Sequence, residues 1–336
     1  MGVAGSTALS PITIEHRSAV ANGTRIHYAE AGDGPLVVLC HGFPECWYSW
    51  REQLNALAGA GFRAVALDMR GYGASDRPTD PSLYTLLHLV ADVAGVVAAS
   101  GSSSAAVVGH DWGAVVAWHA ALLRPDLFRA VAALSVPYRP RGKTRPTLAM
   151  PRNDSERFYQ LYFQEPGVAE AELERDVRRT MRGILVGLSG DRAVADRQGS
   201  RPTAAGMVPR KGGLLDHLPD PARLPGWLTE QDVDFYVGEF TRSGFAGGLN
   251  WYRNIDRNWE LLAAWAGAKI PVPALFVTGA LDPVLAFAGV EQAVAALQTS
   301  VPLLRASLII PGAGHWIQQE RAAEVNSALL EFLRAL

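Results

Sequence analysis

Cysteine is scarce in this sequence, which carries only Cys40 and Cys46. Two thiols do not make the disulfide framework that is typical of small secreted proteins. No apolar run reaches the ~18 residues that a membrane-spanning helix needs, and the first residues lack the basic and apolar segments of a secretion signal. We therefore expect a cytoplasmic protein with reduced cysteines and no membrane anchor.

An excess of charge of one sign is also missing. The 31 lysines and arginines nearly balance the 33 aspartates and glutamates, giving a formal net charge of −2. This balance provides no basic face for nucleic acid, and the sequence shows neither a cluster of metal ligands nor a glycine-rich phosphate loop. We expect a small neutral partner, and no nucleic acid, metal or cofactor.

Apolar residues, by contrast, make up 49% of the chain, enough for a large core. Short apolar runs alternate with helix-like segments, which predicts a mostly parallel, doubly wound sheet with helices on both faces. We expect strands at Ile12–Glu15, Arg25–Glu30, Leu36–Cys40, Arg63–Asp68, Ala105–Val108, Ala130–Val136, Ala274–Thr278 and Ser307–Ile310. We expect helices at Trp47–Ala58, Leu83–Ala99, Trp112–Leu123, Val284–Leu297 and Arg321–Leu336.

The alternation breaks after Pro137. The segment that follows is rich in arginine, proline and helix-like stretches, among them Ala169–Ile184 and Thr229–Ser243, and it indicates an inserted helical cap. Within it, residues 189–225 show little periodicity, which predicts a long irregular excursion of the chain within the cap. We expect an α/β core at residues 11–137 and 262–336, with the cap at residues 138–261.

The most informative motif is Gly109-His110-Asp111-Trp112-Gly113, placed between a predicted strand and a predicted helix. It resembles a nucleophile elbow, a sharp turn that needs small flanking residues, with Asp in place of the usual Ser. Alone, a Gly-x-Asp-x-Gly sequence is also typical of ordinary loops. Its interpretation therefore depends on the rest of the chain.

Two further residues follow predicted strands, Asp282 in Leu281-Asp282-Pro283 and His315 in Gly314-His315-Trp316. Taken singly, Asp282 is typical of a helix N-cap and His315 of a loop. With Asp111 they follow the order nucleophile, acid, histidine of the α/β-hydrolase fold, and the carboxyl ends of parallel strands meet at one edge. We predict a triad there, and a structural, hydrogen-bonding role for nearby His41.

An aspartate nucleophile restricts the substrate. With a reference pKa of about 3.9 it is already ionised, and its attack on a saturated carbon gives a stable alkyl ester, whereas attack on an ester gives a labile anhydride. His315 would then activate water against that ester, and backbone N–H groups of Phe43 and Trp112 would hold the oxyanion. The elbow thus excludes a serine esterase and predicts an electrophilic saturated carbon.

Several segments together resemble the soluble epoxide hydrolases of the α/β-hydrolase superfamily. They are His41-Gly42-Phe43-Pro44-Glu45, Arg70-Gly71-Tyr72-Gly73, the elbow, and two cap segments at residues 159–167 and 249–254. The resemblance implies that Tyr159 and Tyr252 hold the epoxide oxygen. A phenol with a pKa of about 10 remains protonated and can donate to a developing alkoxide. Tyr162 competes with Tyr159 for this role, and we choose Tyr159 from the family pattern.

Two alternatives stay open. A haloalkane or haloacid dehalogenase uses the same triad, but a halide needs only N–H dipoles, so paired tyrosines argue against it; dehalogenases also tend to place Asn at Phe43 or Arg at Trp112. A ligand-binding protein that has lost catalysis is a different class, because fold alone does not set function. The intact set of Asp111, His315 and both phenols argues against that class.

The aromatic residues in and beside these motifs predict a largely aromatic pocket that favours apolar aryl or alkyl epoxides, and the size of the substrate stays open. We expect Trp112, Phe163, Trp251 and Trp316 to line it, together with Gln160. Only about ten residues precede the first predicted strand, so we expect no N-terminal phosphatase domain of the kind found in some vertebrate relatives. The scarcity of lysine favours a bacterial source, and a homodimer stays open.

Overall fold

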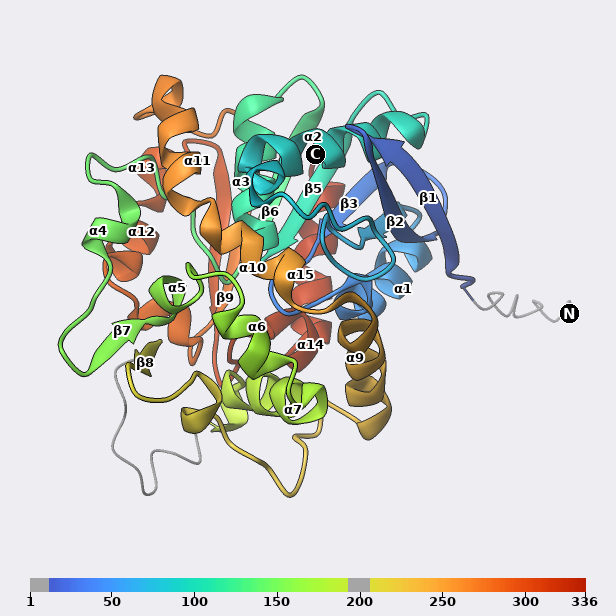
Figure 1. Ribbon diagram of the computed structural model, residues 1–336. Coiled ribbons are helices and arrows are strands. Elements are labelled where there is room, and N and C mark those ends of the chain that lie inside the picture. Colours follow the sequence, from blue (N-terminus) through green and yellow to red (C-terminus); the bar gives the residue numbers. More distant parts are fainter. Residues whose placement is uncertain (1–11, 193–205) are drawn as a thin grey trace, which may run out of the picture.

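A single eight-stranded sheet forms the centre of the protein (Figure 1). The structure is a computed structural model that describes residues 12–192 and 206–336. The strand order is β1-β2-β4-β3-β5-β6-β9-β10, parallel except where β2 pairs with β1 and β4. The strands are β1 (Glu15–Ala21), β2 (Thr24–Ala31), β3 (Leu36–Cys40), β4 (Arg63–Leu67), β5 (Ala105–His110), β6 (Phe128–Leu134), β9 (Ala274–Gly279) and β10 (Leu304–Ile310).

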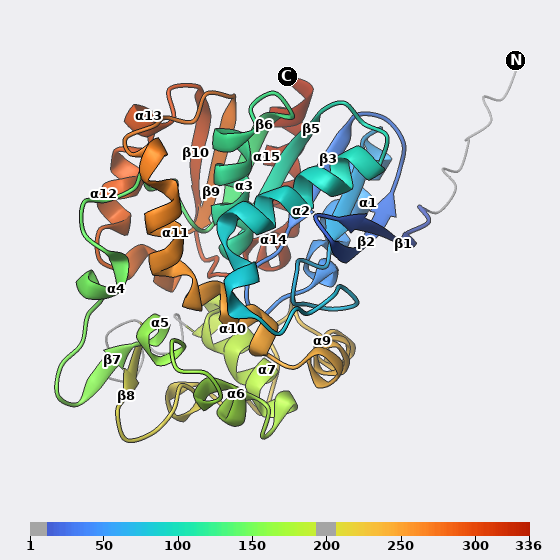
Figure 2. The same ribbon diagram turned by 45° about the horizontal axis from the view of Figure 1, so that its top comes forward.

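Helices cover both faces of this sheet, which confirms the predicted fold class. Along β3, Val38 packs in a cluster with α2 and α3, whereas Val37 and Leu39 pack with α1 and α15 on the other face. Figure 2 shows α2 and α3 in front of the strands. The covering elements are η1 (Trp47–Trp50), α1 (Arg51–Gly59), η2 (Pro81–Tyr84), α2 (Leu86–Ala99), α3 (Trp112–Leu123), α14 (Ile317–Glu320) and α15 (Ala322–Arg334).

The chain between β6 and β9 leaves the sheet and forms a mainly helical layer beyond one end of the strands (Figure 2). A short antiparallel pair of strands, β7 with β8, lies in this layer. Its elements are α4 (Pro146–Ala149), β7 (Glu156–Phe158), α5 (Tyr159–Tyr162), α6 (Val168–Leu173), α7 (Val177–Gly187), β8 (Met207–Pro209), η3 (Leu215–His217), α9 (Glu230–Ser243), α10 (Ala246–Arg253), α11 (Ile255–Leu261) and η4 (Leu262–Trp265).

The first strand does not lie where its apolar residues predicted it. The prediction at Ile12–Glu15 was wrong, because β1 begins at Glu15 and is an edge strand with most residues exposed, so it has no apolar run. The overlooked signal was the turn Asn22-Gly23, where both residues have positive φ (49° and 70°). Asn-Gly is the preferred sequence of a tight hairpin turn, and here it joins β1 to β2.

Two predicted helices are interrupted. Ala169–Ile184 was expected as one helix, but it divides into α6 and α7 because Asp176 caps the start of α7 by accepting from the Arg179 N–H. Val284–Leu297 divides at Gly289, whose φ is 77°. The pieces are η5 (Pro283–Ala286), α12 (Val290–Ala295) and α13 (Leu297–Ser300).

The predicted excursion at residues 189–225 lies partly outside the described residues, since 193–205 are not described. Its described part is not wholly irregular, because it contains β8 and η3. The residue before β8 is hydrogen-bonded to the start of α5: the Tyr159 N–H donates to the Gly206 carbonyl over 2.8 Å. Within the described ranges, none of the helices has the length and apolar character to cross a bilayer.

Candidate active site

Asp111 lies at a sharp turn between β5 and α3, in a conformation that side chains rarely adopt. Its φ is 53° and its ψ is −119°. Small residues make this turn sterically accessible: a Cβ on Gly109 would overlap the Gly113 carbonyl, and a Cβ on Gly113 would overlap the Cys40 carbonyl. This geometry is that of the predicted elbow, in which backbone strain is retained to present one side chain.

The Asp111 carboxylate faces backbone N–H groups from two sides. The Phe43 N–H donates to Oδ1 over 2.9 Å, and the Trp112 N–H also stabilises the charged form. Burial raises the pKa of Asp111 above its usual value, while His315 and these two donors oppose that rise. Gly42 is required beside them, because a Cβ there would overlap the Asp111 side chain.

The structure brings His315 between the two aspartates. Its Nε2 lies 3.8 Å from Oδ2 of Asp111, and its Nδ1 lies 3.1 Å from Oδ1 of Asp282. Burial disfavours the imidazolium, but Asp282 and then Asp111 outweigh it, so the pKa of His315 is raised to about 9. At neutral pH the imidazole is therefore protonated and flanked by two carboxylates.

Ser135 is a member of this cluster that sequence reasoning missed. Its hydroxyl oxygen lies 3.1 Å from Nδ1 of His315, and it also lowers the pKa of Asp282. It follows β6 in a tight turn with φ of 72°, in which the Val136 N–H donates to the Leu134 carbonyl. No motif marks it, but its place directly after a central parallel strand was an available signal.

A buried acid–histidine pair joins His110 of the elbow to the loop after β3, and sequence reasoning missed it too. Oε2 of Glu45 lies 2.6 Å from Nδ1 of His110, and Nε2 of His110 lies 2.8 Å from the His315 carbonyl. Although burial opposes ionisation of Glu45, the neighbouring His110 lowers the pKa of its carboxyl to about 2. His41 has the structural place expected of it: its Nε2 accepts from the Met69 N–H and its Nδ1 donates to the Gly42 carbonyl.

Tyr159 and Tyr252 meet edge to face near Asp111, with ring centroids 5.8 Å apart. Both are buried, and desolvation together with Asp111 raises their pKa values well above the usual range. Each phenol therefore stays protonated. Tyr162 points elsewhere, since its hydroxyl donates to Glu172 over 2.7 Å.

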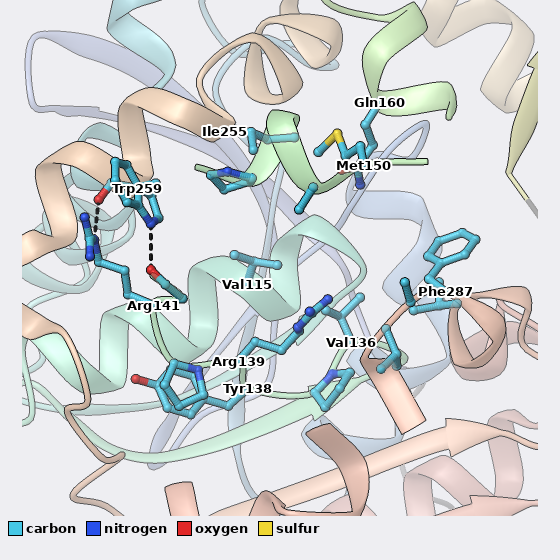
Figure 3. Close-up of a pocket in the computed structure, with 18 of the residues that line it drawn as sticks. Val115, Val136, Tyr138, Arg139, Arg141, Met150, Gln160, Ile255, Trp259 and Phe287 are labelled. Carbon is cyan, nitrogen blue, oxygen red and sulfur yellow. Dashed lines mark hydrogen bonds between the residues drawn. The ribbon is translucent and has the colours of Figure 1, made fainter. Parts of the chain in front are cut away.

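A cavity of about 820 Å³ opens beside Asp111, Trp112 and Tyr159. Figure 3 shows part of its wall. Of the pocket residues expected from sequence, Trp112 and Gln160 line this cavity. The structure does not place the other three along it: Phe163, Trp251 and Trp316 are buried in the surrounding core.

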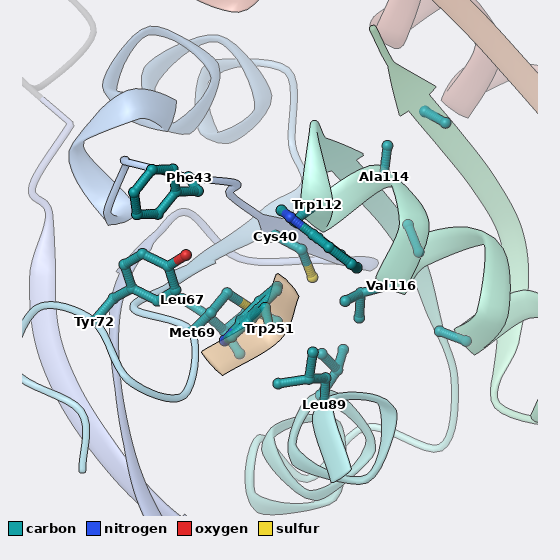
Figure 4. Packing of buried hydrophobic residues seen from close by; sticks show 14 of the residues in the cluster. Cys40, Phe43, Leu67, Met69, Tyr72, Leu89, Trp112, Ala114, Val116 and Trp251 are labelled. Atoms are coloured by element: carbon teal, nitrogen blue, oxygen red, sulfur yellow. The ribbon is translucent and has the colours of Figure 1, made fainter. Parts of the chain in front are cut away.

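Phe163 packs against the rings of Phe43, Tyr159 and Tyr252, and the indoles of the two tryptophans are hydrogen-bonded within the protein. Nε1 of Trp251 donates to the Arg70 carbonyl over 3.1 Å, and Nε1 of Trp316 donates to the Leu185 carbonyl over 2.8 Å. Figure 4 shows Trp251 packed beside Tyr72 and below Trp112. Other aromatic residues line the cavity instead: Tyr138, Phe158, Trp259, Trp265 and Phe287.

Comparisons with known proteins give the family. A family model described as alpha/beta hydrolase fold matches residues 35–322. Epoxide hydrolase A of Mycobacterium tuberculosis is 50% identical over 320 residues, covering 94% of this chain and 96% of that protein. The chain belongs to the epoxide hydrolase family.

Solved epoxide hydrolases share its fold closely. An epoxide hydrolase from an endophytic Streptomyces has a TM-score of 0.90 at 50% identity, covering 97% of this chain and 96% of that one. Epoxide hydrolase A of Mycobacterium thermoresistibile has a TM-score of 0.87 at 49% identity, with 96% and 98% covered. Membership of the epoxide hydrolase family confirms the resemblance that the sequence motifs indicated. Among residues 12–192 and 206–336, no group of three or more His, Cys, Asp or Glu is arranged to hold a metal ion.

Proposed function

We propose that this protein hydrolyses epoxides to vicinal diols through a covalent ester on Asp111. The observation that carries the proposal is the position of Asp111: one carboxylate oxygen accepts the Phe43 N–H, while the other faces Nε2 of His315. Such a carboxylate is held for attack and lies beside a base for the second step. Family membership supports epoxides as the substrate class.

In the first step, Asp111 attacks a ring carbon of the epoxide and the C–O bond breaks. The leaving oxygen takes up a proton from the phenols of Tyr159 and Tyr252. The high pKa of both phenols ensures that they carry that proton at neutral pH. The tyrosine pair regains this proton from the His315 imidazolium through solvent. Asp111 thus loses its negative charge as the ester forms, and His315 loses its positive charge.

The second step uses the change of charge that the first one produces. Once Asp111 is an ester, it no longer raises the pKa of His315, which favours the neutral imidazole. Neutral His315 then removes a proton from water, and the hydroxide attacks the carbonyl carbon of the ester. Backbone N–H groups of Phe43 and Trp112 stabilise the oxyanion, while Asp282 stabilises the imidazolium. The ester C–O bond then breaks, and the leaving oxygen takes the proton of the new carboxylic acid, which releases the diol and restores the Asp111 carboxylate.

Residues 138–261 are proposed as a cap, with residues 11–137 and 262–336 as the catalytic core. Support comes from the insertion of the helical layer between β6 and β9 and from its contribution of both phenols. Cytoplasmic residence is part of the same proposal. It rests on Cys40 and Cys46, which are both free and buried.

A single turnover in heavy-oxygen water, with enzyme in excess over styrene oxide, tests the mechanism. The first diol should carry an oxygen from Asp111, and the label should enter the protein at that residue, as read by mass spectrometry of the peptide. In His315→Gln the alkyl-enzyme should accumulate. Solvent label appearing directly in the first diol would falsify the covalent route.

A further inference from the structure

A second, smaller pocket lies beside α5, apart from the cavity at Asp111. Its volume is about 340 Å³, near the lower end of the range for small-molecule sites. Tyr159 and Gln160 line the cavity at Asp111, whereas Leu161 and Gln164 line the second pocket. Figure 1 shows α5 next to β7 and β8, the strands that carry the rest of this wall. The segment around α5 therefore separates two sites.

Three arginines line the second pocket, which we call the arginine pocket: Arg152, Arg157 and Arg210. Asp256 is the sole carboxylate among the described residues that line it. This carboxylate already has a cationic partner, since its Oδ2 lies 3.2 Å from Nε of Arg145. Positive charge is thus concentrated at one pocket of a chain whose formal net charge is −2, which indicates an anionic ligand.

The backbone places two of these charges directly opposite each other. Arg152 and Arg157 form an antiparallel bridge, and backbone hydrogen bonds of 2.9 Å join the residues on either side of them. They are therefore a non-hydrogen-bonded pair, the kind in which opposing side chains come closest. Like charges in such a pair repel each other. An anion between the two side chains would turn this repulsion into attraction.

The three arginines lack carboxylate partners. Across residues 12–192 and 206–336, no aspartate or glutamate lies within ion-pair distance of any of them. Nε of Arg157 is also buried without a hydrogen-bond partner. Unpaired charge and an unpaired buried donor both favour the binding of an anion at this pocket.

Contacts with neutral groups hold the three side chains in place. Nη2 of Arg152 and Nε of Arg210 each donate to a backbone carbonyl, over 3.1 and 2.8 Å. The guanidinium carbon of Arg157 lies 4.9 Å from the centroid of the Tyr162 ring. A guanidinium has five N–H donors, so most of them remain for a ligand. Side chains that are held in this way lose little conformational freedom when the ligand binds.

We propose that the arginine pocket binds a phosphate dianion, either inorganic phosphate or the phosphate group of a small molecule. Two arginines come from one hairpin and Arg210 follows β8, so the donors approach from more than one strand. Such a set suits a tetrahedral group with several oxygens and two negative charges better than a planar carboxylate with one. The inference does not depend on the proposed function, because binding requires no epoxide.

Titration calorimetry with inorganic phosphate at about pH 8, where phosphate groups are dianionic, tests the site. The protein should bind phosphate saturably, and added sodium chloride should weaken the binding. Arg157→Gln should weaken it about tenfold or more, as expected for loss of a charge-assisted hydrogen bond, and Arg157→Lys should retain part of the affinity. Arg305→Gln is the matched control, because Arg305 is exposed on β10 and carries the same charge. It should bind phosphate as the wild type does.

Thermal unfolding of Arg152→Gln gives a second readout, which a merely structural arginine would not produce. Without phosphate this variant should melt at or above the temperature of the wild type, because one charge of the repelling pair is gone. In saturating phosphate it should melt below the wild type, which gains more stability from the bound anion. The same change in both buffers would reject the site.

Three other outcomes would also overturn the inference. They are the absence of saturable phosphate binding, unchanged binding in Arg157→Gln, and equal weakening in Arg305→Gln, which would indicate general attraction to positive charge. Binding to phosphatidylcholine vesicles that contain phosphatidic acid, without binding of free phosphate, would reject a small-molecule ligand. None of these results bears on epoxide hydrolysis, so the two proposals fail separately.

Discussion

Ser135 and Asp282 approach the same ring nitrogen of His315. The Ser135 hydroxyl oxygen and Oδ1 of Asp282 each lie 3.1 Å from Nδ1. The N–H at Nδ1 can be shared between the two acceptors, while the serine hydroxyl has its own proton to donate to the carboxylate. The orientation of the imidazole thus depends on the serine that follows β6 as well as on the acid that follows β9.

Two substitutions of Ser135 should separate its role in orienting the His315 imidazole from the strain in its own backbone. Both Ser135→Ala and Ser135→Gly remove the hydroxyl, so hydrolysis of the alkyl-enzyme should slow about three- to tenfold in each, the effect of one hydrogen bond. Glycine also tolerates the φ of 72°, so Ser135→Gly should be more stable than Ser135→Ala by about 1 kcal/mol. Rapid-quench kinetics and urea unfolding measure the two effects, and unchanged hydrolysis in both variants would remove Ser135 from the site.

The two cap phenols should control formation of the ester. Losing the hydroxyls of both Tyr159 and Tyr252 should slow alkylation of Asp111 by at least about a hundredfold, the usual contribution of general acid catalysis. Tyr162→Phe is the matched control: it breaks a hydrogen bond to Glu172 within the cap but should leave alkylation unchanged. Stopped-flow tryptophan fluorescence with styrene oxide measures these rates, and normal alkylation by the double variant would contradict the assignment.

Neutralising Asp111 should lower the pKa of His315. The pKa is about 9 in the free protein partly because of the Asp111 carboxylate, so Asp111→Asn, which imitates the uncharged ester, should shift the imidazole titration to lower pH. Asp282→Asn should shift it further, because Asp282 contributes more. NMR of ¹⁵N-labelled imidazole measures the titration. Asp126→Asn, at an exposed residue, is the control and should leave the pKa of His315 unchanged.

The same raised pKa predicts how stability depends on pH. His315 has a reference pKa of 6.5 and a value of about 9 in the folded state, so the folded protein binds more protons than the unfolded chain between these values. This contribution is complete below pH 6.5 and is lost as the pH rises through about 9. Denaturant unfolding should show that the difference in stability between wild type and His315→Gln shrinks over this window. A constant difference would refute the raised pKa.

Gly42 should be essential for activity because of its neighbour. A Cβ at this position would overlap the Asp111 carboxylate, and a displacement of about 1 Å at a nucleophile can cost about a hundredfold in rate. Gly42→Ala should therefore lose alkylation. Gly238→Ala in α9 has open space around it and should instead stabilise the protein by about 0.5–1 kcal/mol. Burst kinetics and thermal unfolding of both variants provide the comparison.

The sequence was sufficient to predict what depends on local chain geometry. Asp111, Asp282 and His315 each follow a strand, and their order along the chain carries the signal. Ser135 and the pair of Glu45 with His110 escaped prediction because their partners are distant: Glu45 and His110 are 65 residues apart, and Ser135 lies 180 residues from His315. No local pattern records such contacts.

The pocket could not be predicted for a related reason. Aromatic residues close to the motifs, such as Trp251 and Trp316, were expected to face the substrate. Their indole N–H groups instead donate to buried carbonyls, and hydrogen bonding of this kind determines the direction of a tryptophan in a core. The side chains that do face the cavity, including Arg139 and Phe287, come from segments without a recognisable motif.

The end of α7 is tied to the loop that carries His315. The His315 N–H donates to the Leu188 carbonyl over 2.9 Å, and Trp316 reaches back to Leu185. Glu320 accepts from the N–H groups of Gly190, Gly314 and Trp316. A shift of α7 relative to the sheet would move the His315 backbone and so change the distances from its imidazole to Asp111 and Asp282. The end of α7 and the His315 loop are therefore held together as one unit, so the position of His315 depends on the segment between β6 and β9.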